Sequence, residues 1–154
     1  MLHWDGRKVV AYDGRETAPM AADEKLFLLP DGKAMAFYDA VVGGRSVGTP
    51  GAVRMLELAH KQYGKLPWAR LCEPAIRLSE NGFPMSPRLN MQLASEKYLK
   101  NDAAASAYFY NADGTPKAVG TSMRNPALAA TLRAIAANPD ALYAGEIPAD
   151  VVKA

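Results

Sequence analysis

Apolar residues recur at spacings of three and four from about residue 50 onward, the spacing of one face of an α-helix. Val53, Leu56, Ala59 and Tyr63 share one such face, and Gly64 follows them as a stop signal. A further helix begins near Ala149 and runs to the last residue. The pattern predicts five complete helices, at residues 50–63, 67–81, 87–100, 126–137 and 139–144.

Four dipeptides mark the starts of four of these helices, because in each a capping residue precedes a proline. The side-chain oxygen of Thr, Ser or Asn accepts a hydrogen bond from a first-turn N–H, and proline at the first helical position loses no hydrogen bond. Pro74 falls inside the second helix and predicts a kink. The dipeptides are Thr49-Pro50, Ser86-Pro87, Asn125-Pro126 and Asn138-Pro139.

The first 49 residues show no helical period. The β-branched run 8–12 lies between two Asp-Gly turns and predicts a strand, without a hairpin partner upstream. Residues 34–42 are apolar without a clean period and predict extended or irregular chain, and a loop of about 25 residues separates the third and fourth helices. The predicted class is mostly α with a few short strands: strand and loops over 1–49, helices over 50–154.

Composition narrows the function. Lys+Arg is 18 and Asp+Glu is 16, so the net charge of +2 argues against nucleic acid as a partner. No apolar run reaches the ~18–20 residues of a membrane span, and the start shows no signal peptide. The two histidines and single cysteine make neither a disulfide nor a metal motif, and no cofactor motif is present.

Three candidate sites have simpler structural interpretations. Residues 43–48 resemble a phosphate loop only weakly, because they lack its Lys-Ser/Thr pair, and predict a glycine-rich connection. Cys72 and His60 could form a thiol–imidazole pair, but the apolar setting of Cys72 predicts a buried structural cysteine. Asp23 and Glu24 are expected to be solvated.

The segment 13–19 is a stronger candidate. Arg15 and Glu16 follow a strand and a glycine turn, a position where binding residues are common. A guanidinium suits two-point binding of a carboxylate, although an exposed turn residue is the alternative interpretation of Arg15.

The same segment, D-G-R-E-T-A-P, resembles the D-x-R-E-x-A-P signature of gamma-glutamyltranspeptidases. The resemblance continues in the same order over nearly the whole chain. It includes S-V-G-T-P-G-A-V at 46–53, H-K-Q-Y-G-K-L-P-W at 60–68, P-A-I at 74–76 with E-N-G-F at 80–83, N-P-A-L-A at 125–129 and Y-A-G at 143–145.

This resemblance implies an N-terminal nucleophile (Ntn) hydrolase with a complete αββα sandwich fold, made as a precursor that cuts itself. The new N-terminal threonine then cleaves the gamma-glutamyl amide of glutathione or another donor, and water or an amino-acid or peptide acceptor resolves the acyl-enzyme. No threonine of this chain has that context, so the nucleophile is expected outside it. Residues 1–154 are then an internal part of the large subunit, within a single Ntn-hydrolase domain, inactive alone and without a cofactor. Its partners are the rest of the large subunit and the small subunit, in the periplasm or outside the cell.

Within this chain the resemblance assigns Arg15 to the alpha-carboxylate of the gamma-glutamyl group and Glu16 to the orientation of Arg15. Two alternatives stay open: part of a related cephalosporin acylase, and a non-catalytic helical scaffold or binding module. We also expect the isolated chain to expose a large apolar surface, because its strand and helices were selected to pack on a sheet outside it.

Overall fold

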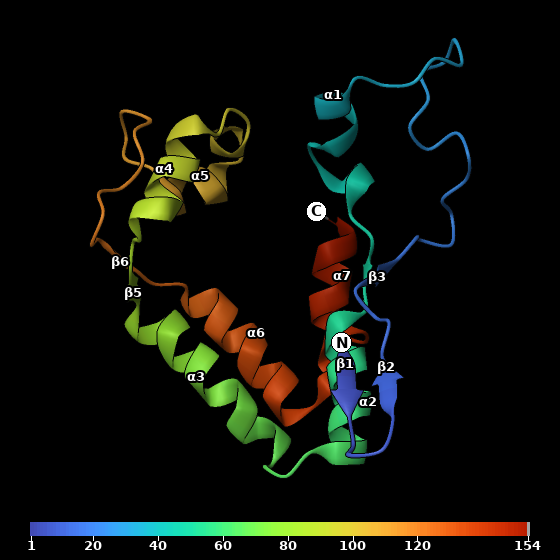
Figure 1. The fold of residues 1–154 in the computed structure, drawn as a ribbon. Coiled ribbons are helices and arrows are strands. Elements are labelled where there is room, and N and C mark those ends of the chain that lie inside the picture. The colour runs from blue at the N-terminus through green and yellow to red at the C-terminus, as the bar shows by residue number, and fades with distance from the viewer. Residues whose placement is uncertain (154) are drawn as a thin grey trace. The chain divides into compact units, whose positions relative to one another are not determined.

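The computed structural model describes residues 1–153 (Figure 1). Helices account for nearly half of them, and the strands are short pairs, so the predicted class is confirmed. The chain forms two compact units. Unit 1 comprises Met1–Trp68 and Ala137–Ala154, and unit 2 comprises Ala69–Ala136.

Unit 1 begins with a β-hairpin, so the prediction of an unpartnered strand near residues 8–12 was wrong. Strands β1 (Leu2–Trp4) and β2 (Val9–Ala11) pair antiparallel, with Leu2 opposite Ala11. The side chain of Asp5 closes the turn, because its Oδ1 accepts hydrogen bonds from the backbone N–H groups of Arg7 and Lys8. Asp5-Gly6 therefore lies in a turn, as predicted, but the strand before this turn was not predicted.

The predicted helix start at Thr49-Pro50 was also wrong. These two residues form strand β4 (Thr49–Pro50), which pairs antiparallel with β3 (Glu16–Thr17). Helix α2 (Ala52–Tyr63) starts two residues later, behind Gly51 and without a side-chain cap. Pairing with a distant segment has overridden the local capping signal.

The remaining elements of unit 1 are short. Within the stretch predicted to be extended or irregular, residues 37–41 form a helical turn, α1 (Phe37–Val41), followed by the 3₁₀ helix η1 (Gly44–Ser46). The predicted helix 139–144 is the 3₁₀ helix η3 (Pro139–Leu142), whose first turn Asn138 caps by accepting from the Asp140 N–H. Helix α7 (Glu146–Lys153) begins three residues before the predicted start.

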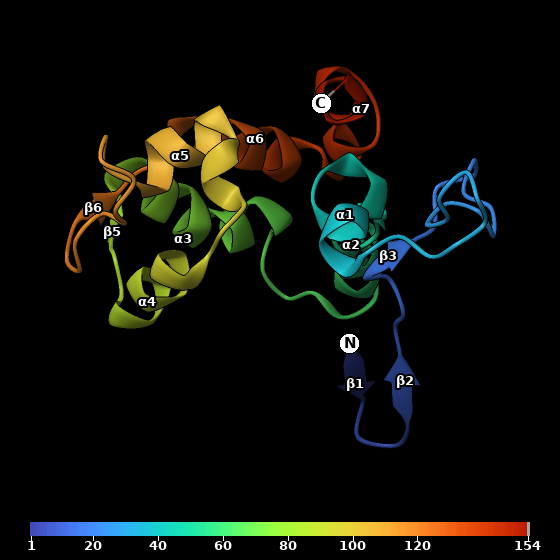
Figure 2. The same ribbon diagram turned by 90° about the horizontal axis from the view of Figure 1, so that it is seen from above.

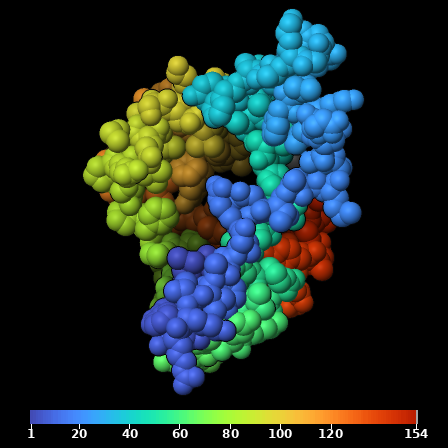
Figure 3. Space-filling view, turned by 45° about the vertical axis from the view of Figure 1, so that its right-hand side comes forward, coloured from blue at the N-terminus to red at the C-terminus, as the bar shows by residue number. Residues whose placement is uncertain are grey.

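Helix α2 organises unit 1. The His3 ring of the hairpin stacks on Tyr63 with centroids 3.8 Å apart, and Figure 3 shows the blue N-terminal residues against the green segment of α2. Arg54 forms ion pairs with Glu57, at 2.7 Å, and with Asp140, at 2.5 Å. The Tyr143 hydroxyl accepts from the Arg54 backbone N–H at 3.0 Å. These contacts fix η3 on α2.

Unit 2 matches the helix predictions more closely. Helix α3 (Trp68–Asn81) and helix α6 (Pro126–Ala137) agree with the predicted ranges to within one residue, and Figures 1 and 2 show them side by side and antiparallel. Arg133 of α6 pairs with Glu80 of α3. Strands β5 (Phe83–Pro84) and β6 (Ser122–Met123) pair just beyond these helices.

The third predicted helix, 87–100, is shorter than expected. Helix α4 (Pro87–Ser95), capped by Ser86, stops before the 3₁₀ helix η2 (Leu99–Asn101). The predicted long loop contains a helix, α5 (Ala103–Phe109), whose first turn is capped by Asp102. Unit 2 closes around a core of four buried side chains: Met85, Leu93, Tyr110 and Met123.

Apolar side chains are exposed in many places, as predicted for the isolated chain. Leu56, Leu71, Leu128 and Val152, each on a different helix, are among them. Cys72 is half-buried rather than buried, and burial raises the pKa of its thiol. Within residues 1–153, no helix has both the length and the apolar character needed to cross a membrane.

Candidate functional site

Unit 1 contains a pocket of about 720 Å³. Its walls come from residues 15–19, from the segment around Leu26 and Phe27, and from residues 45–50. It therefore joins two of the segments that the sequence singled out separately, D-G-R-E-T-A-P and S-V-G-T-P-G. A volume of this size is in the range of small-molecule sites.

The β3–β4 pairing brings these two segments together. Glu16 lies opposite Pro50 and Thr17 opposite Thr49, and the Gly51 N–H donates to the Arg15 carbonyl at 3.1 Å. A Cβ on Gly51 would lie 2.5 Å from the Gly14 carbonyl oxygen, closer than any real Cβ contact. The two backbones can approach this closely only because Gly51 has no side chain.

Arg15 is a highly exposed charged group of the pocket, with 88% of its side chain accessible. Its Nη1 donates to Glu16 Oε1 at 2.8 Å. An exposed ion pair of this kind adds little to stability, and the guanidinium retains free N–H donors. The geometry is that of a guanidinium available to an anionic ligand, with a carboxylate beside it that restricts its orientation.

Arg45 is a pocket residue that the sequence reasoning missed. Its Nη1 donates to the Leu26 carbonyl at 2.7 Å, which connects two walls of the pocket. The residue stood inside the glycine-rich run that was interpreted only as a connection. A basic residue within that run was the available signal.

The other candidate residues from the sequence do not line the pocket. The His60 Nε2 contacts the Leu66 carbonyl at 2.7 Å, and Cys72 belongs to unit 2. Asp23 and Glu24 are exposed, as predicted. Among residues 1–153, no group of three or more His, Cys, Asp or Glu side chains is placed to hold a metal ion.

Comparison with known proteins identifies the class to which this fold and pocket belong. A family model described as gamma-glutamyltranspeptidase matches residues 1–154. The chain is 41% identical over 146 residues to "Glutathione hydrolase 2" of Arabidopsis thaliana, covering 93% of this chain and 24% of that protein. The chain therefore belongs to the gamma-glutamyltranspeptidase family.

Solved structures agree with this assignment. The gamma-glutamyltranspeptidase of Helicobacter pylori matches 99% of this chain with a TM-score of 0.91 and 28% identity, and this chain covers 44% of it. A cephalosporin acylase from Bacillus halodurans matches 97% of this chain with a TM-score of 0.70 and 26% identity, and 29% of its own length is covered. The chain thus spans about a quarter of the curated relative and less than half of either solved chain.

Proposed function

We propose that this chain is part of the large subunit of a gamma-glutamyltransferase or glutathione hydrolase, within a single Ntn-hydrolase domain, and that its pocket binds the gamma-glutamyl donor. Family membership supports the reaction class. The remainder of the large subunit and the small subunit are its proposed partners. The family resemblance supports a periplasmic or extracellular location.

The observation that carries the proposal is the exposed Arg15 guanidinium at the pocket wall, with Glu16 beside it. A gamma-glutamyl donor has an alpha-carboxylate at one end and the scissile amide further along. Two parallel N–H···O bonds from a planar guanidinium would fix the carboxylate and so set the position of the amide. The role of Glu16 is to hold Arg15 in the orientation that makes both bonds.

The proposed reaction uses a threonine outside this chain. Its Oγ attacks the gamma-carbonyl carbon, the C–N bond breaks, and the proton removed from the hydroxyl passes to the departing amine. Water then hydrolyses the resulting ester to release glutamate, or an amino acceptor takes the gamma-glutamyl group. The isolated chain is expected to be inactive, because it supplies binding groups but no activated nucleophile.

The test is Arg15→Lys in the complete, matured enzyme. Lysine keeps the charge but loses the two-point geometry, so kcat/KM for a gamma-glutamyl anilide should fall at least about tenfold. A matched anilide that lacks the alpha-carboxylate should be affected little, and self-cleavage of the precursor should persist. Equal loss on both anilides, or no loss on either, would show that Arg15 is only a turn residue.

A second candidate function is hydrolysis of a cephalosporin side-chain amide, favoured by the match to the Bacillus halodurans acylase. Rates of hydrolysis by the complete enzyme separate the two functions, because an acylase would hydrolyse a cephalosporin side-chain amide faster than the gamma-glutamyl anilide. If the complete enzyme hydrolyses neither, the non-catalytic scaffold or binding module remains.

A further inference from the structure

The charges of the pocket are not balanced. Three charged residues line it, Arg15, Glu16 and Arg45. Arg15 is matched by Glu16 at 2.8 Å, whereas the hydrogen-bond partner of Arg45 is the neutral carbonyl of Leu26. No carboxylate within residues 1–153 forms an ion pair with Arg45. The unmatched positive charge of the pocket therefore lies at Arg45.

The Leu26 contact also positions this charge. One Nη1–H is used by the carbonyl, and the other guanidinium N–H groups remain available on a side chain that lines the pocket. A side chain already held by one hydrogen bond loses less conformational freedom when a ligand binds to its remaining donors. Arg45 thus has both the charge and the partial preorganisation of an anion-binding group.

We propose that Arg45 binds a second carboxylate of the donor, at the end opposite the one held by Arg15. This inference rests on the proposed function. The ligand class is a gamma-glutamyl peptide with a free C-terminal carboxylate, of which glutathione is one. Two guanidiniums in one pocket match the two carboxylates of such a peptide, and the pocket volume of about 720 Å³ suits a ligand of that size.

The competing interpretation is that Arg45 is purely structural and only holds the Leu26 segment against the pocket wall. A structural residue would affect the binding of every donor equally, whatever the charge of the donor. A carboxylate-binding residue would instead favour donors with an acidic C-terminus, and this preference would weaken as salt is added.

The experiment compares glutathione with its C-terminal carboxamide in the complete, matured enzyme, by measuring glutamate release. The two substrates differ only in the charge and hydrogen bonding of one end. We expect the wild type to show a kcat/KM roughly tenfold higher for glutathione, because a charge-assisted hydrogen bond is lost in the amide. The ratio should fall in high salt.

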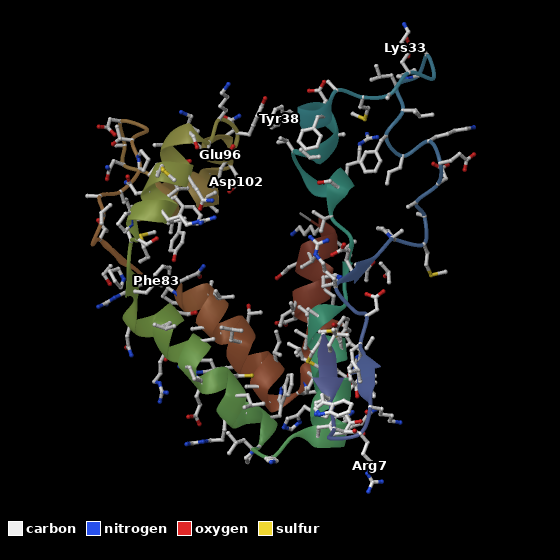
Figure 4. The ribbon with its side chains drawn as sticks, in the orientation of Figure 1. Arg7, Lys33, Tyr38, Phe83, Glu96 and Asp102 are labelled. Carbon is white, nitrogen blue, oxygen red and sulfur yellow. The ribbon has the colours of Figure 1, made fainter. Side chains whose placement is uncertain are left out.

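Arg45→Gln should abolish this preference by raising KM for glutathione, with kcat/KM for the carboxamide little changed. Arg45→Lys should keep part of the preference, and gives a second test should the glutamine variant fail to fold. Arg7→Gln is the matched control, since Arg7 projects from the hairpin turn outside the pocket lining (Figure 4) and its removal should change neither rate.

Equal wild-type rates on the two substrates would overturn the inference while leaving the proposed function in place. So would an equal loss on both substrates in the Arg45 variants. Absence of glutamate release from either substrate by the wild type would remove the proposed function itself.

Discussion

The pocket segment of unit 1, residues 13–51, and the core of unit 2 are held together in different ways. In unit 2, Met85, Leu93, Tyr110 and Met123 pack on one another, and none is more than 4% exposed. Residues 13–51 contain no buried side chain. Their shape depends on the β3–β4 pairing and on the close approach of Gly14 and Gly51.

This difference separates two kinds of sensitivity. Unit 2 should respond to the volume of its side chains, because its core is close-packed. The pocket segment should respond to changes at its backbone crossing, and tolerate changes of side-chain volume elsewhere. The comparison therefore predicts which substitutions affect stability alone and which also affect ligand binding.

The largest effect is expected for Met85→Ala in unit 2. Met85 is 1% exposed, and truncation of a buried methionine costs about 2–5 kcal/mol of unfolding free energy. The measurement is the free energy of unfolding of the complete enzyme in denaturant, together with KM for the donor. Met91→Ala is the control, because Met91 lies nearby in helix α4 but is 65% exposed. A large rise in donor KM in the folded Met85 variant would contradict the separation of the two regions.

A smaller loss of stability with a clear loss of binding is expected for Gly51→Ala. The new Cβ would meet the Gly14 carbonyl at 2.5 Å, and relief of such overpacking costs about 1–3 kcal/mol. Because the strands must separate to make room, donor KM should rise as well. Gly44→Ala is the matched control, since a Cβ there has no neighbour within 4 Å. Unchanged KM in the Gly51 variant would show that the crossing does not shape the site.

The smallest effect is expected for Glu57, whose ionisation makes the stability of unit 1 depend on pH. Its carboxylate accepts from Lys61 at 2.6 Å and from Arg54 at 2.7 Å, and these bonds hold its pKa below the ordinary value of 4.5. The ionised carboxylate therefore makes its full contribution to the free energy of unfolding at pH values above the pKa that Glu57 has in the unfolded chain. This contribution is lost as the pH falls through the lower pKa that Glu57 has in the folded protein.

The measurement is Tm as a function of pH. The wild type should lose Tm more steeply than Glu57→Gln on acidification below about pH 4.5, the ordinary glutamate pKa. Glu73→Gln, at an exposed pair with Arg70 at 3.3 Å, should follow the wild type because such pairs contribute little. Parallel wild-type and Glu57→Gln profiles would argue against this role.

The sequence predicted unit 2 better than the pocket segment because local signals determine most of unit 2. Asn125-Pro126 starts α6 as expected, and the Asn125 side chain accepts from the Leu128 N–H at 2.9 Å. Helix α5 was missed because its small residues carry no apolar period, although Asp102 was a readable cap. The local rules worked where each helix is defined by its own residues.

The same rules failed where a distant partner decides the structure. Thr49-Pro50 has the form of a cap, but the antiparallel partner, Glu16–Thr17, lies more than thirty positions earlier in the sequence. Arg15 could be found from its motif and its chemistry. Arg45 could not, because its significance depends on the Leu26 carbonyl and on a pocket that exists only after the strands pair.

The division of the chain also has a consequence for the order of folding during synthesis. Unit 2 is continuous, whereas unit 1 needs residues 137–154 to complete it. The Arg54–Tyr143 hydrogen bond joins positions 89 residues apart, so its partners meet only after all of unit 2 has been made. Closing a long loop carries an entropic cost that local contacts avoid. Unit 2 can therefore fold on the ribosome first, whereas unit 1 is completed only after the segment containing Tyr143, which anchors helix α2, has been synthesised.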